Sequence, residues 1–271
     1  MRLAKYHALG NDFLVVVDLD GRQPVDEATA RALCDRHRGV GADGLIRATS
    51  GRDGADVTME LRNADGGRAE TSGNGLRCLA RALVDAGVVS GPRMMVATDA
   101  GPSAAEVHAD GTVTVDMGVA RILADGELGG ATGGVWAHRH VDMGNPHLVL
   151  ARRDLTGVAV ERIGPEAERA FPGGINVEFV VTGPGPDELT MRVWERGVGE
   201  TQSCGSGACA AAAAFRDLKQ VGDRVVVHQP GGDLIVDLGG DRILLTGPAE
   251  LVCTVEVPEV RAAGSGERCR S

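Results

Sequence analysis

The sequence predicts a mixed α/β protein of two pseudo-equivalent domains that face each other. Its 271 residues are enough for two domains of ordinary size. The same strand–turn–helix pattern also occurs twice, because Glu-Thr precedes a turn ending in Gly-x-Gly both at residues 70–75 and at residues 200–207. This repeat period is far longer than that of a solenoid, so the pattern indicates an internal duplication.

The second copy of the pattern, at residues 189–214, is the most informative part of the chain. Alternating apolar residues at 189–194 predict a strand that leads into the turn. The alanine run at 210–214 predicts a buried helix that follows. Cys204, flanked by glycines, is therefore expected at or just before a helix N-terminus. Unpaired N–H groups there can bind a carboxylate, and the site can lower the pKa of a thiol.

The first copy has the same organisation around a different residue. Residues 59–63 predict a strand, and residues 76–84 predict a helix with apolar side chains at helical spacing. Ser72 precedes Gly73-Asn74-Gly75 just as Cys204 precedes its own Gly-x-Gly. The simplest interpretation of Ser72 is a helix N-cap, which does not exclude a role in chemistry.

Composition argues against several function classes. The net charge of −10 does not suit a nucleic-acid surface, and no stretch has the length of a signal peptide or a membrane span. The six cysteines show neither a Cys-x-x-Cys pair nor zinc spacing, so we expect a reduced, cytoplasmic protein. His138 and His140 share one strand face without an evident third ligand, so no metal site is expected.

The first half of the chain, residues 1–117, is predicted to form one domain. A hairpin opens it, with the turn at Gly10-Asn11-Asp12, and a helix follows at residues 26–36 with Asp26 as its N-cap. The glycine-rich loop that comes next lacks the Lys-Ser/Thr of a phosphate-binding loop. The helix of the first copy is expected to end at Gly87, and residues 112–117 to form a strand.

The second half, residues 118–254, is predicted to repeat this plan. The turn at 143–147 leads into a strand, and residues 166–171 are predicted to be helical. Further strands are predicted at residues 148–150, 175–181, 224–227, 234–238, 242–245 and 252–257. We expect residues 255–260 to return as a last strand to the first half, and the Gly/Ser/Arg-rich tail, 261–271, to be disordered.

Five motifs, taken in order, resemble diaminopimelate epimerase. They are Gly10-Asn11-Asp12-Phe13, the run from Arg36 to Asp43, Gly73-Asn74-Gly75-Leu76-Arg77, Gly144-Asn145-Pro146-His147, and the run from Glu195 to Gly207. The resemblance runs in register over nearly the whole chain except the C-terminal tail. It implies a cofactor-independent amino-acid racemase whose two pseudo-symmetric domains are each a β-barrel-like sheet around a central helix.

The resemblance also implies roles for individual residues. Cys204 matches one catalytic cysteine, Ser72 stands at the position of the other, and His147 matches a histidine that could orient or polarise a thiol. Glu195 matches a position near the acid/base pair and the substrate. The positions that match contacts to the substrate α-carboxylate are Gly73, Asn74, Gly205 and Ser206. The other matched substrate-binding positions are Asn11, Asn63, Asn145, Asn176, Glu195 and Arg196.

Epimerisation explains why such an architecture is useful. A proton must leave one face of the α-carbon and another must return to the opposite face, so two acid/base groups must flank it. Two facing helix N-termini would hold the α-carboxylate while enolate-like charge develops on it, without a metal or pyridoxal phosphate.

The chain departs from the family at Ser72, where the family has a cysteine. A serine hydroxyl is a far weaker acid than a thiol and cannot rest as an anion at neutral pH without a strong adjacent base. The serine is a natural variant, an engineered substitution, or a sign of another substrate or of an elimination reaction that needs one thiolate base. Gly44 replaces a glutamine found in many members, and Ser206 replaces a threonine.

The sequence thus leaves function hypotheses of two classes. The first is an epimerase that converts LL-2,6-diaminopimelate into the meso form for lysine and cell-wall synthesis, with a racemase, isomerase or dehydratase acting on another amino acid as its variant. The second is a non-catalytic protein that binds an amino acid, because Ser72 has silenced the chemistry. A homodimer is expected from the resemblance, and a small amino acid is the expected partner.

Overall fold

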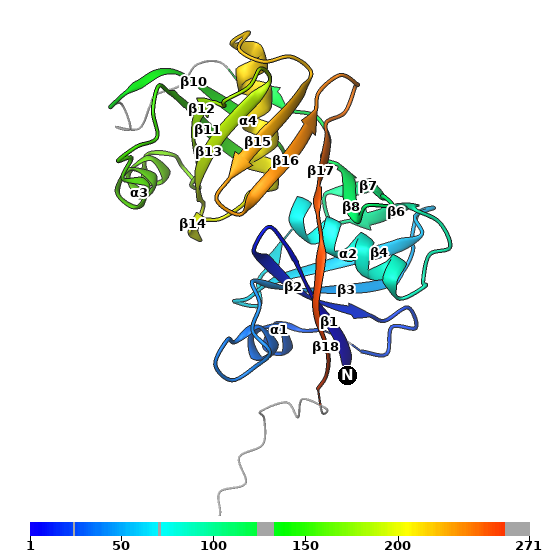
Figure 1. Ribbon diagram of the computed structural model, residues 1–271. Coiled ribbons are helices and arrows are strands. Elements are labelled where there is room, and N and C mark those ends of the chain that lie inside the picture. The colour runs from blue at the N-terminus through cyan, green and yellow to red at the C-terminus, as the bar shows by residue number, and fades with distance from the viewer. Residues whose placement is uncertain (24, 70–71, 124–132, 258–271) are drawn as a thin grey trace, which may run out of the picture.

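The computed structural model describes residues 1–23, 25–69, 72–123 and 133–257. Over these residues the chain forms four helices and 18 strands, arranged as two lobes (Figure 1). We call the lobe built on β1–β8 the N-terminal lobe and the lobe built on β10–β17 the C-terminal lobe. This arrangement confirms the mixed α/β class predicted from the sequence.

The N-terminal lobe alternates antiparallel and parallel neighbours. β1 pairs with β2, which runs parallel to β3, and β3 pairs with β4, which runs parallel to β6; β7 and β8 complete the lobe as antiparallel strands. The bounds are β1 Arg2–Ala8, β2 Asn11–Val17, β3 Gly44–Ser50, β4 Val57–Asn63, β5 Arg68–Ala69, β6 Arg93–Thr98, β7 Gly101–Val107 and β8 Thr112–Asp116.

The C-terminal lobe repeats this order strand for strand. β10 pairs with β11, which runs parallel to β12. β12 pairs with β13, which runs parallel to β15, and β16 and β17 follow as antiparallel strands. The bounds are β9 Arg121–Ile122, β10 Val135–Asp142, β11 Pro146–Arg152, β12 Asn176–Thr182, β13 Glu188–Glu195, β14 Gly199–Thr201, β15 Arg224–Gln229, β16 Gly232–Asp237 and β17 Leu244–Pro248. The duplication seen at two turns in the sequence therefore extends through the whole fold.

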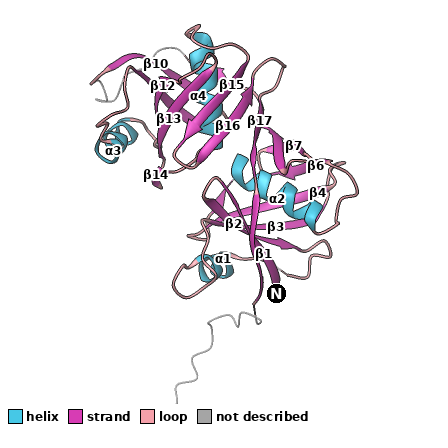
Figure 2. Cartoon of the chain, in the orientation of Figure 1, coloured by secondary structure: helices cyan, strands magenta, loops and turns pink. Residues whose placement is uncertain are grey.

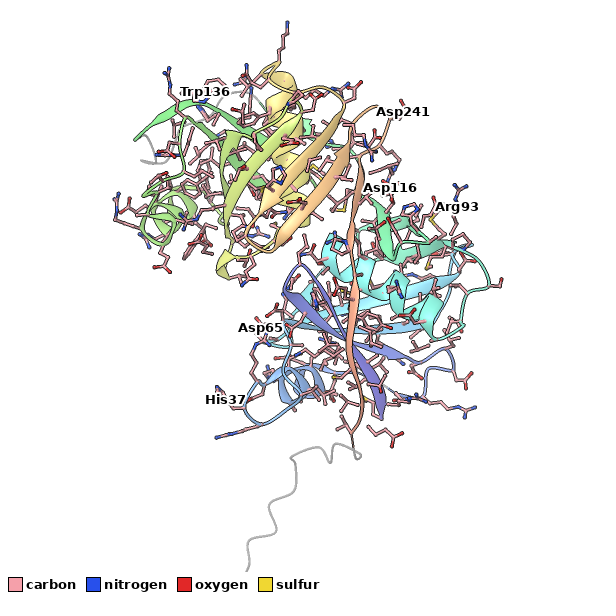
Figure 3. The ribbon with its side chains drawn as sticks, in the orientation of Figure 1. His37, Asp65, Arg93, Asp116, Trp136 and Asp241 are labelled. Atoms are coloured by element: carbon pink, nitrogen blue, oxygen red, sulfur yellow. The ribbon has the colours of Figure 1, made fainter. Side chains whose placement is uncertain are left out.

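Two strand pairings join the lobes. β17 pairs with β8, and β18 (Glu250–Glu256) crosses back to pair with β1. Asp116, labelled in Figure 3, lies at the end of β8 where β8 pairs with β17, and forms an ion pair with Arg242. The domain limits at 1–117 and 118–254 stay a prediction. Residues 258–260 of the expected last strand and the tail 261–271 lie outside the described residues.

Each lobe contains one buried helix and one peripheral helix (Figure 2). α2 (Gly73–Asp85) packs against strands of the N-terminal lobe, and α4 (Gly205–Asp217) packs against strands of the C-terminal lobe. Residues 207–215 of α4 are all buried, so the small alanine side chains allow the strands to approach the helix closely. α1 (Glu27–Cys34) packs against β3 and β4, and α3 (Val160–Ala170) packs against β12, β13 and β14.

Two predicted helices differ from the observed ones at their ends. α1 has the expected N-cap, because the Asp26 side chain accepts from the Thr29 N–H, but it ends at Cys34 rather than at residue 36. Asp35 ends it, since its carboxylate accepts from the N–H groups of His37 and Arg38 and forms a turn. α3 begins at Val160, six residues before the predicted start, and continues through Pro165.

Candidate active site

The two buried helices begin with the same cap geometry. Ser72 is the N-cap of α2 and accepts the Gly75 N–H at 3.0 Å through its Oγ. Cys204 is the N-cap of α4 and accepts the Gly207 N–H at 3.4 Å through its Sγ. The prediction that Cys204 lies at a helix N-terminus is therefore confirmed, and Ser72 occupies the equivalent place in the other lobe.

The two N-termini are in contact with each other. A Cβ placed on Gly205 would lie 3.4 Å from Asn74 Oδ1 and 3.7 Å from Gly73 Cα. The Leu245 side chain on β17 packs against both helices, because its Cδ2 would lie 3.2 Å from a Cβ on Gly73 and 3.0 Å from one on Gly205. The glycines thus allow two helices and a strand to converge at one point.

This convergence creates a concentrated set of hydrogen-bond donors. The first N–H groups of any helix have no intrahelical partner. The third donors, Gly75 and Gly207, are taken by the caps. The N–H groups of the two preceding residues in each helix, Gly73, Asn74, Gly205 and Ser206, have no partner within their own helix. Together with the positive ends of two helix dipoles, these groups are suited to bind one carboxylate.

A chain of hydrogen bonds fixes the asparagines at the junction. Arg77 Nη2 donates to Asn74 Oδ1 at 2.9 Å, and Asn74 Nδ2 donates to Asn11 Oδ1 at 3.1 Å and to the Ser203 carbonyl at 3.2 Å. Asn11 Nδ2 in turn donates to Asp43 at 2.8 Å. Since arginine can only donate and an ionised carboxylate can only accept, the two ends of the chain determine the orientation of both amides.

Charged side chains hold the hairpin that carries Asn11. Arg36 makes a bidentate contact with Asp12 at 3.0 and 2.8 Å, and Lys5 lies 2.8 Å from the same carboxylate. Burial opposes ionisation of Asp12, but the hydrogen bonds from Arg36 and Lys5 outweigh it and lower its pKa to about 2. Asp12 is therefore ionised throughout the range in which the protein would work.

The Cys204 thiol is surrounded by acidic groups. The Sγ atom contacts the Glu195 carboxylate and lies 3.6 Å from the Ser206 hydroxyl. The backbone N–H of Cys204 donates to the Gln229 side-chain oxygen at 2.8 Å. Burial, and then the carboxylates of Glu195 and Glu178, raise the pKa of this thiol well above its usual value. The sequence suggested a lowered pKa, and desolvation outweighs the helix terminus here.

The pKa of Glu195 is also raised. Burial is the largest cause, and it prevails over the stabilising hydrogen bonds from Thr201 and Cys204. The Glu178 carboxylate raises it further, whereas His147 acts in the opposite direction. The four groups form one electrostatic cluster on the C-terminal-lobe side of the junction.

His147 is held between two oxygen atoms. Its Nδ1 lies 2.7 Å from Glu178 Oε1, and its Nε2 lies 3.0 Å from Asn145 Oδ1. His147 and Glu178 are both fully buried. The expected pairing of His147 with the acid/base region is thus accompanied by a carboxylate partner, Glu178, to which the sequence analysis gave no role.

The remaining predicted substrate-binding residues lie at or next to strand ends in both lobes. Asn176 donates to the Pro146 carbonyl at 3.0 Å and accepts the Arg196 N–H at 2.9 Å. The Arg196 side chain is exposed and donates to the Gly173 carbonyl at 3.3 Å. Asn63 is exposed at the end of β4, opposite Gly44. Among the described residues, no hydrogen bond joins these three to Ser72 or Cys204.

Gly44 has a structural reason to be a glycine. A Cβ there would lie 2.9 Å from the Arg62 carbonyl oxygen and 3.1 Å from the Phe13 ring. A longer side chain at this position would need the backbone of β4 to move. The departure from the glutamine of the family therefore matches the local packing of β3 against β4.

The other buried cysteines have the character of apolar filler. Burial raises the pKa of Cys34 to about 11 and the pKa values of Cys78 and Cys209 to about 12. Cys253 on β18 is exposed. Cys204 thus differs from the other buried cysteines in its place at a helix cap next to a carboxylate.

Sequence reasoning gave no role to three residues of the site. Asp43 and Arg77 lie inside motifs that were recognised, but only the fold places them at the two ends of the asparagine chain. Glu178 had one usable signal: it is a charged residue in the middle of an otherwise apolar strand run, residues 175–181. Such a carboxylate needs a buried partner, and the parallel pairing of β11 with β12 supplies His147.

Two further observations limit what the described residues can do. Within residues 1–23, 25–69, 72–123 and 133–257, no group of three or more His, Cys, Asp or Glu side chains is arranged to hold a metal ion. In the same part of the chain, no helix combines the length and the apolar character needed to cross a membrane.

The sequence was compared with known families and proteins. The family profile described as diaminopimelate epimerase matches residues 3–123 and 139–252. The chain is 40% identical to a diaminopimelate epimerase from a Cyanothece species, covering 93% of this chain and 98% of that protein. It is also 40% identical to one from Desulfitobacterium hafniense, covering 93% and 96% of the two chains.

The chain belongs to the diaminopimelate epimerase family.

Solved structures place this family member in a wider fold group. A PhzF-family phenazine biosynthesis protein from Bacillus anthracis superposes with a TM-score of 0.75 at 17% identity, covering 95% of this chain and 99% of that one. A probable proline racemase from Agrobacterium radiobacter gives a TM-score of 0.73 at 16% identity, covering 95% and 93%. At such low identity the likeness concerns the fold, which confirms the pseudo-symmetric α/β architecture expected from the resemblance.

Proposed function

We propose that this chain is an epimerase that interconverts LL- and meso-2,6-diaminopimelate by proton transfer at the α-carbon. One observation carries the proposal: two helix N-termini are in contact, and their N-caps are a serine from one lobe and a cysteine from the other. Membership of the diaminopimelate epimerase family supplies the substrate.

The reaction follows from the groups at the junction. The free N–H groups of the two helices bind the α-carboxylate and stabilise the enolate-like charge that develops on it. The Cys204 thiolate takes the α-proton from one face, so the C–H bond breaks and an S–H bond forms. The Ser72 hydroxyl then gives its proton to the opposite face of the carbon. The alkoxide regains a proton from solvent and the Cys204 thiol releases one to solvent, which restores both groups.

The raised pKa of the Cys204 thiol requires a reason for it to ionise in the complex. The α-ammonium group of the substrate brings a positive charge close to the thiol, which offsets the nearby carboxylates. In this proposal Glu195 and His147 position and tune the thiol. Asn63, Asn145, Asn176 and Arg196 bind the parts of the substrate beyond the reacting carbon, with Asn11 and Asn74 near the α-carboxylate.

The same proposal covers the biological setting. The reaction would need no cofactor, since carboxylate binding and the two acid/base groups supply its chemistry. The product would serve lysine and cell-wall synthesis in the cytoplasm. A homodimer is the proposed assembly, and no nucleic-acid partner is proposed for a chain with a net charge of −10.

The test is incubation of the protein with LL-2,6-diaminopimelate in D₂O. Exchange of the α-proton is followed by NMR, and stereochemistry by chiral chromatography. Wild-type protein is expected to give exchange with inversion. The Cys204→Ala variant is expected to give neither, because the base that removes the proton is lost.

The Ser72 variants separate the two half-reactions. Ser72→Ala is expected to impair inversion more than exchange, since proton abstraction does not need the hydroxyl. Ser72→Cys is expected to raise the rate of inversion, because a thiol is a better acid than a hydroxyl. Normal epimerisation by Cys204→Ala would show that the assigned base is wrong. Exchange without inversion in the wild type would mean that Cys204 acts alone and that Ser72 cannot return the proton. No exchange would indicate another substrate or a binding protein.

A further inference from the structure

Glu178 lies directly beneath the first turn of α4. It points from β12 toward the helix, and a Cβ placed on Gly207 would lie 2.8 Å from Glu178 Oε1. The carboxylate is fully buried and bonds the His147 ring at 2.7 Å through this oxygen. Among the described residues its other oxygen, Oε2, has no hydrogen-bond partner. The fold therefore keeps a poorly satisfied acid next to the residues that hold Cys204.

The duplicated fold provides an internal comparison. In β11 and β12, His147 is opposite Asn176, and Glu178 is two residues further along. In the N-terminal lobe, Phe13 of β2 takes the place of His147 and lies opposite Gly44 of β3. Ile46 of β3 takes the place of Glu178. The helices agree with this alignment: a Cβ on Gly75 of α2 would lie 3.3 Å from Ile46 Cδ1, just as one on Gly207 of α4 would meet Glu178.

The comparison shows that the fold does not require a charged pair at this place. Phe13 and Ile46 are buried and fill the equivalent space in the N-terminal lobe with apolar atoms. A buried ion pair is often less stabilising than an apolar pair of similar volume. The acid and the histidine beneath α4 are thus explained by the chemistry of Cys204, and not by the packing of the lobe.

We propose that Glu178 is a positioning residue of the proton-transfer site, which holds the His147 ring by its Nδ1–H and fixes it between Glu178 and Asn145. On the other side of the ring, Nε2 lies 3.0 Å from Asn145 Oδ1, so the imidazole is held between two acceptor oxygens. This inference rests on the proposed epimerase function. It makes the Cys204 side of the site electrostatically different from the Ser72 side.

The charge of Glu178 also acts on the thiol. The groups that face Cys204 are Glu195 from β13, Glu178 from β12 and the Ser206 hydroxyl and Gly207 N–H from α4, with His147 from β11 next to the two acids. Glu178 is one of two negative charges that disfavour the thiolate. Removing the charge of Glu178 should therefore make the Cys204 thiol ionise at lower pH. Removing the Glu178–His147 hydrogen bond should release the imidazole ring.

The experiment uses three variants of the full chain. Glu178→Gln keeps the size and an oxygen that accepts from Nδ1–H, but removes the charge. Glu178→Ile copies the N-terminal lobe and removes both. Ile46→Val is the matched control, since it trims the equivalent position of the other lobe and should leave both readouts near wild type.

The first readout needs no substrate. Alkylation of Cys204 by iodoacetamide is followed against pH by mass spectrometry of its peptide. Glu178→Gln is expected to shift the midpoint to lower pH by about half a unit or more. An unchanged midpoint in Glu178→Gln would overturn the proposal, whether or not the protein is an epimerase.

The second readout is epimerisation of LL-2,6-diaminopimelate as a function of pH. Glu178→Gln is expected to keep measurable activity with its rising limb moved to lower pH. Glu178→Ile leaves the buried His147 ring without its partner, so it is expected to lower the urea midpoint. The folded protein is expected to lose roughly 100-fold in kcat with a smaller change in KM. Wild-type kcat in Glu178→Ile would overturn the inference. An inactive wild type would instead overturn the proposed function and leave the alkylation result to stand.

Discussion

At the scale of single residues, Cys204 combines features that usually occur apart. Its place as a helix N-cap favours a negative charge, but burial and two neighbouring carboxylates raise the pKa of its thiol. Ser72 has the matching cap position in the other lobe with a hydroxyl that titrates far outside the physiological range. The two acid/base groups are therefore unequal, and the pH dependence of the reaction should report on Cys204.

We expect the rate of α-proton exchange to rise with pH across the range from about 7 to 9. The raised pKa of Cys204 means that the thiolate is scarce at neutral pH and becomes more abundant as pH rises toward that pKa. The check is the initial exchange rate of LL-2,6-diaminopimelate in D₂O buffers of constant ionic strength. A rate that is flat or falls over this range would contradict the assignment of Cys204 as the base.

The sequence predicted the cap residues but missed their neighbours for a definite physical reason. Ser72 and Cys204 stand next to Gly-x-Gly in the sequence, so local turn chemistry reveals them. Glu178 and His147 are 31 residues apart, and only the parallel register of two strands brings them to 2.7 Å. Local patterns carry no information on which strands become neighbours.

At the scale of elements, α4 shows how composition determines packing. Residues 207–215 are all buried, and five of them form the alanine run 210–214. A helix of small residues lets strands on several sides approach its backbone, which positions Cys204 at its N-terminus close to β12 and β13. The rigidity of the site thus depends on the absence of large side chains in this helix.

Ala211→Leu is expected to lower the free energy of unfolding by about 2 kcal/mol, because extra methylene groups in a filled core force side chains and backbone apart. The urea midpoint measures this effect. Ala170→Leu, at an exposed position near the end of α3, is the matched control and should change stability by less than about 0.5 kcal/mol. Equal midpoints for the two variants would mean that α4 has free space around it.

Several elements with clear apolar patterns were predicted, whereas β3, β6 and β7 were not. Strands such as β2, β8, β12 and β13 have alternating or continuous Val, Leu and Met residues and were recognised. β7 was missed because its sequence, Gly-Pro-Ser-Ala-Ala-Glu-Val, has the composition of a loop. Its pairing with β6 and β8 overrides that weak propensity.

At the scale of the whole molecule, the chemistry depends on how closely the two lobes approach each other. Apart from the helix N-termini, the tip of the β1–β2 hairpin touches the C-terminal lobe. A Cβ on Gly231 would lie 2.3 Å from the Leu9 carbonyl oxygen, and one on Gly10 would lie 2.7 Å from the Gln202 side chain. The hairpin that carries Asn11 is therefore fitted directly against the turn between β15 and β16.

Gly231→Ala tests this contact. The added methyl group meets a backbone atom that no rotamer change can move, so the hairpin and the C-terminal lobe must separate. We expect a loss of epimerase activity of roughly 100-fold with little change in the far-UV circular dichroism spectrum. Gly91→Ala, where a Cβ would meet nothing within 4 Å, is the control and should keep its activity. Wild-type activity in Gly231→Ala would show that the lobes need not fit so closely.

The pairing of β18 with β1 has a consequence for biosynthesis. β1 is made before its partner β18, which begins at Glu250 and follows the whole C-terminal lobe in the sequence. At roughly 5–20 residues per second, β1 must wait tens of seconds for that partner. During this time one edge of the N-terminal lobe stays open while the C-terminal lobe is still being translated. Completion of the first lobe thus has to follow synthesis of the second, and a chaperone that shields the waiting β1 edge would act on this protein before any enzyme exists.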